Sequence, residues 1–141
     1  MQLLNEDETA TPTTMMVAEY TSNTGGIENR LRIKETVPIP SIPVNKPRIL
    51  VKIFNVSLNS QDYKVSEIPN FGRLALPPPS TPGTDFVGRV HESSDPDFTA
   101  GELVFGTLPV PERHGTLAEY AVVKKDGMVK VPTSLPPGVD L

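Results

Sequence analysis

Prolines divide this chain into short apolar runs, and this division constrains the possible folds more than any other feature of the sequence. The 141 residues include 16 prolines, which stand between the apolar runs rather than in one tract. Proline has a fixed φ and no backbone N–H, so it is confined to strand ends, sheet edges and loops. The spacing therefore predicts an all-β or β-dominated fold, in which many short strands are joined by rigid turns.

The composition predicts one folded domain and excludes several classes of function. Hydrophobic residues make up 37% of the chain and charged residues 21%, and the length suits a single core. The absence of cysteine excludes disulfides, thiolate metal ligands and a cysteine nucleophile. No secretory signal is present and no apolar run approaches the ~20 residues of a membrane span, so we expect a cytoplasmic protein with no membrane partner. The net charge of −4, with scattered Lys and Arg, argues against nucleic-acid binding.

Apolar patterning places the expected strands. Residues 49–58 are apolar at nearly every position, which is typical of a central strand that is buried on both faces. Residues 31–37 alternate between apolar and polar side chains, which predicts a half-buried strand. The other expected strands cover residues 15–20, 85–92, 103–106, 117–123 and 128–131.

Few segments favour helix or disorder. Residues 59–62 offer side chains that cap a helix, so one short helix is expected over residues 63–66. Residues 68–82 contain glycine and several prolines, and we expect them to form a long loop. Residues 1–14 are polar and rich in threonine, which predicts a disordered N-terminal arm. Residues 15–141 are then the one domain.

Several short motifs follow one another in order along the chain. Asn59 follows a strand and precedes Asp62 by three residues, and a Pro82-Gly83 turn opens a strand that ends in Gly88-Arg89-Val90. The remaining motifs are Gly-Glu-Leu-Val at 101–104, Gly-Thr-Leu-Ala-Glu-Tyr at 115–120 and Val-Lys-Val-Pro at 129–132. In order and spacing, the motifs resemble the N-terminal catalytic domain of medium-chain dehydrogenases/reductases, in the zinc-free branch of quinone oxidoreductases and enoyl reductases. The resemblance covers roughly residues 15–136.

This resemblance implies a fold and a cofactor. The fold is a GroES-like (alcohol dehydrogenase N-terminal-like) domain over residues 15–141, a partly closed antiparallel β-barrel with one short helix. In the family a second, Rossmann-type domain binds NADPH, and that domain is lacking in this chain, which has no G-x-G-x-x-G pattern. We therefore expect no cofactor bound by this chain alone, and NADPH is implied for a full-length relative.

No zinc site is expected. Zinc-type relatives carry Cys at the position of Asn59 and His at the position of Thr84. A zinc site needs three or four ligands that converge on one point, and this chain supplies no cysteine and two histidines, His91 and His114. We expect both histidines to be structural or to face solvent.

Asn59 and Tyr63 are the candidates for catalysis. By resemblance, Asn59 faces the cleft for substrate and nicotinamide, where its amide would hydrogen-bond a substrate carbonyl and stabilise the charge that develops during hydride transfer. The structural alternative, compatible with this role, is that Asn59 caps the following helix. Tyr63 carries a hydroxyl that is able to donate a proton in an enoyl reduction. Its alternative is a half-buried packing residue with a satisfied hydroxyl.

We expect a concave substrate site lined by Asn59, Asp62, Phe71, Thr84 and Phe86. Asp62 either orients its neighbours or favours a helix N-terminus electrostatically. Family members place a tyrosine in the loop after the helix, where this chain offers Phe71, which has no hydrogen-bond donor. Thr84-Asp85 resembles the corresponding pair of polyketide-type enoyl reductases, and is interpreted first as structural and second as lining of the cleft.

Three functions are left open, as is the question whether this chain is an enzyme alone. The resemblance favours the substrate-side domain of an NADPH-dependent, zinc-independent reductase of the enoyl reductase or quinone oxidoreductase type, not redox-active by itself. The second is a stand-alone barrel that binds a small apolar or carbonyl-containing molecule, with cofactor-free cyclisation or isomerisation. The third is an interaction module, whose cleft is covered by a second copy or by a partner protein.

Overall fold

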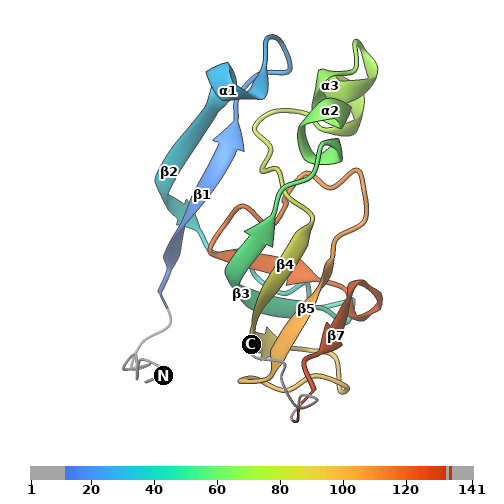
Figure 1. Cartoon of the computed structure of the whole chain (residues 1–141). Coiled ribbons are helices and arrows are strands. Elements are labelled where there is room, and N and C mark those ends of the chain that lie inside the picture. The colour runs from blue at the N-terminus through green and yellow to red at the C-terminus, as the bar shows by residue number, and fades with distance from the viewer. Residues whose placement is uncertain (1–11, 133, 135–141) are drawn as a thin grey trace.

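The strands form two antiparallel sheets in the computed structural model, which describes residues 12–132 and 134 (Figure 1). A two-stranded sheet pairs β1 (Thr14–Tyr20) with β2 (Leu31–Pro38). A five-stranded sheet has the order β6-β3-β4-β5-β7, formed by β3 (Ile49–Ser57), β4 (Asp85–Ser93), β5 (Leu103–Thr107), β6 (Tyr120–Val123) and β7 (Met128–Lys130). The β-dominated, antiparallel prediction is confirmed, although the described strands do not close into a barrel.

The helices are short, and there are more of them than the sequence indicated. They are α1 (Ile27–Arg30), α2 (Gln61–Glu67) and α3 (Phe71–Ala75), with a 3₁₀ turn, η1 (Lys125–Gly127). Figure 1 shows α2 and α3 together beyond one end of the larger sheet. The expectation of one helix, and of a loop throughout 68–82, is wrong because α3 packs its buried Gly72 on α2: a Cβ there would lie 2.3 Å from the Ser66 carbonyl oxygen. In the described part of the chain, no helix is long and apolar enough to cross a membrane.

The first residues of β3 lie at the centre of the core. Ile49, Leu50 and Val51 are at most 3% exposed, because β3 pairs with β4 and β6 and is covered on both faces. The expectation of a central strand is confirmed by its place between β6 and β4, but burial on both faces is limited to its first three residues: Phe54 is 47% exposed, and Leu58, beyond the end of β3, is 60% exposed. On one face β3 belongs to a cluster of Ile49, Val51, Phe86, Val90, Val104, Leu108, Ala121, Val123 and Met128; on the other, Leu50 packs with Met15, Val17 and Tyr120.

Three boundaries or environments differ from the expectations. β2 is mostly exposed rather than half-buried, with Ile33 64% exposed, because β1 faces the rest of the domain and β2 is the outer strand of the pair. β6 begins at Tyr120 because residues 117–119 pair with β1 instead. The ordered chain begins before residue 15: Thr14 opens β1, and the Thr13 carbonyl accepts a 3.2 Å bond from the Ile39 N–H. Residues 1–11 of the expected arm lie outside the described residues.

A close backbone contact joins two of the sequence motifs. The Gly83 carbonyl accepts the Thr116 N–H at 2.9 Å, and the Pro82 carbonyl accepts the Leu117 N–H at 3.0 Å. A Cβ on Gly115 would lie 2.3 to 2.5 Å from three backbone carbonyl oxygens, so only glycine fits there. Gly83 has φ +95°, which also favours glycine. The Pro82-Gly83 turn and the motif at 115–120 therefore form the two halves of one tertiary contact.

Gly115→Ala should destabilise the domain by about 2–3 kcal/mol, since the added methyl meets backbone that cannot move aside. Urea unfolding of the variant and of wild type measures the difference. The matched control is Gly101→Ala: Gly101 has φ +93°, but no atom lies within 4 Å of the place where an alanine methyl would stand, so only about 1 kcal/mol of backbone strain is expected. Equal losses in the two variants would contradict the steric role of Gly115.

Candidate functional site

Asp62 organises the turn between β3 and α2. Its carboxylate accepts the Asn59 backbone N–H at 2.6 Å and the Thr84 hydroxyl at 3.2 Å. Both Asp62 and Thr84 are buried, at 8% and 5% exposure. The α2 N-cap is Ser60, and no side chain caps the helix by a hydrogen bond. Asp62 therefore ties the start of α2 to the start of β4, and it positions the backbone of Asn59.

The Asn59 side chain points to β4 rather than to the helix. Its Nδ2 donates to Asp85 Oδ2 at 2.7 Å, so the hypothesis that Asn59 caps the helix is wrong. The Asp85 backbone carbonyl in turn accepts the hydroxyl of Thr116, which is fully buried. The Asp85 carboxylate therefore holds the side-chain amide of the exposed Asn59 in one orientation. The buried Thr116 in turn fixes the backbone of Asp85.

A buried arginine anchors the other end of α2. Arg30, only 4% exposed, donates to Ser66 Oγ at 3.0 Å and to Glu67 Oε1 at 3.2 Å. Its guanidinium also lies 4.9 Å from the centre of the Tyr20 ring. Burial raises the pKa of the Tyr20 hydroxyl, against the opposing effect of nearby hydroxyls and of Arg30. The helix that carries Asp62 and Tyr63 is thus fixed to the β1–β2 hairpin.

One cavity lies beside Asn59. It has a volume of about 290 Å³ and is lined by Ile27, Leu31, Leu58, Asn59, Ser60, Asp62, Tyr63, Pro82 and Leu117. Three of the expected site residues, Asn59, Asp62 and Tyr63, meet here. The remaining lining is mainly apolar, and it comes from the hairpin, from Leu58 and Ser60 between β3 and α2, and from both halves of the Gly83–Gly115 contact.

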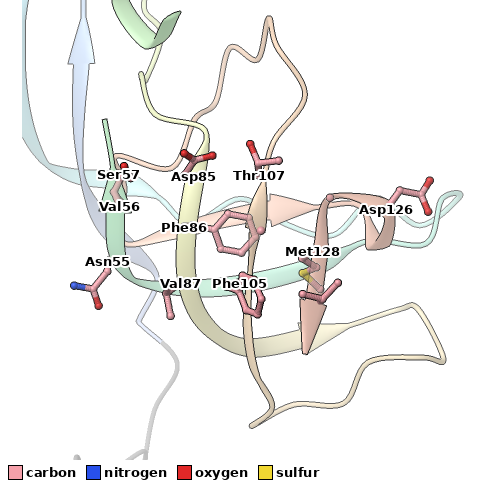
Figure 2. A pocket seen from close by; sticks show the side chains of 13 residues that line it. Asn55, Val56, Ser57, Asp85, Phe86, Val87, Phe105, Thr107, Asp126 and Met128 are labelled. Carbon is pink, nitrogen blue, oxygen red and sulfur yellow. The ribbon is translucent and has the colours of Figure 1, made fainter. Parts of the chain in front are cut away.

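The second cavity lies on the five-stranded sheet and measures about 630 Å³. Figure 2 shows Asp85 with Ser57 and Thr107 at one end, and Phe86 and Phe105 further along the strands. Its lining includes two carboxylates, Asp85 and Asp126, and no lysine or arginine. The Asn59–Asp85 hydrogen bond therefore joins a residue that lines one cavity to a residue that lines the other.

The structure does not bring all the expected substrate residues into one cleft. Thr84 is buried behind Asp62 and lines neither of these two cavities. Phe86 lines the larger cavity but is 3% exposed, with most of its ring in the core. Phe71 is 51% exposed on α3 and lines neither of the two.

Sequence reasoning missed residues that complete the site. The sequence presents Asp85 only as the neighbour of Thr84, yet it is the acceptor for the Asn59 amide. Leu117 lies within the 115–120 motif that contributes to the family resemblance, and this motif is the sequence signal that could have found it. Ile27 and Leu31 reach the smaller cavity from the start of the hairpin, and no local pattern links them to Asn59.

Both histidines are placed away from any cluster of metal ligands. The rings of His91 and Tyr120 meet edge to face, with centroids 5.3 Å apart. His114 is exposed. Among residues 12–132 and 134, no three His, Asp or Glu side chains are grouped so as to hold a metal ion.

Asp62→Asn should lower the free energy of unfolding by about 1–2 kcal/mol, because a neutral amide cannot accept from both Asn59 and Thr84 as a carboxylate does. It should also speed hydrogen exchange at the Asn59 amide, which NMR measures. Asp126→Asn is the control, because it removes the same negative charge from an exposed residue. It should change the free energy of unfolding by less than about 0.5 kcal/mol. Unchanged exchange at Asn59 in the first variant would contradict the role of Asp62.

Comparison with known proteins places this geometry in a family. The model of the alcohol dehydrogenase GroES-like domain matches residues 45–133. Trans-enoyl reductase pgmF of Aspergillus terreus is 38% identical over 130 residues, which cover 86% of this chain and 36% of that protein. The chloroplastic quinone-oxidoreductase homolog of Spinacia oleracea is 30% identical over 120 residues, which cover 84% and 35%. This chain thus spans about a third of the length of the curated relatives it matches.

A solved structure agrees with these matches. The quinone oxidoreductase of Coxiella burnetii superposes with a TM-score of 0.72 at 28% identity, over 86% of this chain and 38% of that chain. The family match includes both halves of the Gly83–Gly115 contact and the Asn59–Asp85 pair. The chain belongs to the alcohol dehydrogenase GroES-like domain family of medium-chain dehydrogenases/reductases, with trans-enoyl reductases and quinone oxidoreductases among its relatives.

Proposed function

We propose that this chain is the substrate-side domain of a zinc-independent reductase, which acts on a polarised alkene or a quinone. The observation that carries this proposal is the held amide of Asn59, exposed beside an apolar cavity and oriented by the Asp85 carboxylate. The family supports the reaction class, since this chain is similar to trans-enoyl reductases and quinone oxidoreductases.

The amide suits the charge that such a reaction produces. When hydride adds to a carbon conjugated with a carbonyl, electron density moves to the carbonyl oxygen, and a fixed N–H donor at that oxygen stabilises it. A primary amide has two N–H groups. One N–H of the Asn59 amide donates to Asp85, which leaves the other to donate to a substrate oxygen. Tyr63, half-buried in the same cavity wall, is the proposed proton donor.

NADPH is the hydride donor that the resemblance implies, and we propose that this chain does not hold it alone. The sequence has no dinucleotide fingerprint. The larger cavity next to Asp85 is lined by two carboxylates and no cation, which disfavours phosphate groups. In this proposal, the chain binds and polarises the substrate and donates a proton through Tyr63, and it does not hold the hydride donor.

Titration of the 141-residue chain with 1,4-naphthoquinone, followed by ¹H–¹⁵N NMR, tests the proposal. We expect saturable shifts at Asn59, Tyr63 and Leu117. Asn59→Ala should raise the Kd about 5- to 10-fold, the value of one hydrogen bond. NADPH should cause no saturable shift.

Asn45→Ala is the matched control, because Asn45 is exposed in the connection between β2 and β3 and lines none of the cavities described. Its Kd should equal that of wild type. Equal affinity in wild type and Asn59→Ala, or shifts confined to other surfaces, would contradict the proposed site.

One observation favours a second function, self-association through the five-stranded sheet. Val87 pairs with Phe105, and Phe105 pairs with Val129, across β4, β5 and β7. These three side chains are 40%, 43% and 54% exposed, and so form an apolar row on the surface. Monomeric domains seldom expose a large contiguous apolar patch.

Sedimentation equilibrium measures this self-association. Wild type should dimerise with rising concentration, and Phe105→Ser should shift the equilibrium to the monomer because it removes the central side chain of the row. Leu74→Ser is the control, since Leu74 is 82% exposed on α3, away from the sheet. A wild-type chain that stays monomeric at all concentrations would exclude this second function.

A further inference from the structure

A third cavity, of about 500 Å³, lies on the other side of the hairpin from Asn59. It is enclosed by the β1–β2 hairpin with the proline-rich connection that follows β2, by residues 79–81, and by residues 112–122. Val17, Val37, Val122 and several prolines give it apolar walls. It shares no lining residue with the cavity beside Asn59, so the proposed reductase site does not account for it.

Two polar residues, Glu19 and Thr81, line this cavity. Between Tyr20 and Ser80, the backbone forms an antiparallel bridge with N–H to carbonyl distances of 2.9 and 3.1 Å. Glu19 precedes Tyr20 and Thr81 follows Ser80, so this bridge brings the two segments together at the cavity wall.

Neither side chain has a partner within the described part of the chain. Thr81 is only 7% exposed, yet its hydroxyl makes no hydrogen bond to the residues that the structure describes. The half-buried Glu19 carboxylate forms no hydrogen bond or ion pair with them. An unpartnered hydroxyl and an unpartnered carboxylate that line one cavity are able to accept hydrogen bonds from a bound molecule.

The wall around Thr81 is held in place without a ligand. The Thr81 N–H donates to the Arg113 carbonyl, and the Thr81 carbonyl accepts from Gly115, both at 2.9 Å. Arg113 also lines the cavity, and its Nε donates to the Pro79 carbonyl at 3.1 Å. Arg32, opposite Glu19 in the hairpin, donates to the Leu31 carbonyl at 2.7 Å.

We propose that this cavity binds a small organic ammonium ion with an apolar body. The ammonium group donates to the Glu19 carboxylate and the Thr81 hydroxyl, and its three N–H donors suit two neighbouring acceptors. The hydrocarbon part packs on Val17, Val37 and Val122. The net charge of −4 favours the approach of cations.

Benzylammonium, with benzyl alcohol as its neutral isostere, is the probe for the 141-residue chain. NMR titration should give saturable shifts at Glu19, Thr81 and Val122, with tighter binding of the ammonium than of the alcohol. Glu19→Gln should raise the Kd for benzylammonium at least about tenfold, as expected for loss of a charge-assisted bond. Thr81→Val should raise it about threefold or more, and Thr81→Ser should restore it.

Glu35→Gln is the matched control, because it removes the same charge from an exposed position on the outer strand of the same hairpin. It should leave the Kd unchanged. The proposal is overturned if benzylammonium does not saturate, if Glu19→Gln and Glu35→Gln bind equally, or if benzyl alcohol binds as tightly as benzylammonium. Naphthoquinone binding at Asn59 is a separate measurement, so failure of one site is distinguishable from failure of the other.

Discussion

The backbone contact between residues 81–84 and residues 115–117 is the constraint on which the rest of the domain depends. It exists because glycine at 115 lets two chain segments meet at hydrogen-bond distance. From this contact, Thr84 reaches Asp62, Thr116 reaches the Asp85 carbonyl, and Thr81 is directed into the third cavity. Asp62, Asp85 and Thr81 each line a different cavity, so this one contact places parts of all three cavities.

The strands were predictable because their signals are local. The positions of the prolines and the apolar run at 49–58 located β3 and its neighbours, although only the first three residues of β3 are buried on both faces. The alternation in β2 indicated the strand but not its environment, because a period of two does not say whether anything covers the apolar face. Ile33, for example, lies on the apolar face that was expected to be buried, yet it is 64% exposed.

The site was predictable where chain neighbours form it and not where tertiary contacts do. Asn59, Asp62 and Tyr63 lie within five positions, and they meet at one cavity. Phe71 does not join them, because α3 is held by close packing of Gly72 on Ser66, a contact that no sequence pattern announces. The direction of the Asn59 amide was missed for the same reason: its acceptor, Asp85, is 26 positions away.

The hairpin separates the two cavities proposed to bind small molecules, and Arg30 joins it to α2. Ile27 and Leu31 line one of these cavities, while Val17 and Glu19 line the other. Both cavities therefore share the hairpin as a wall, and the bonds from Arg30 to Ser66 and Glu67 hold that shared wall against α2. A change that loosened these bonds would disturb both cavities together.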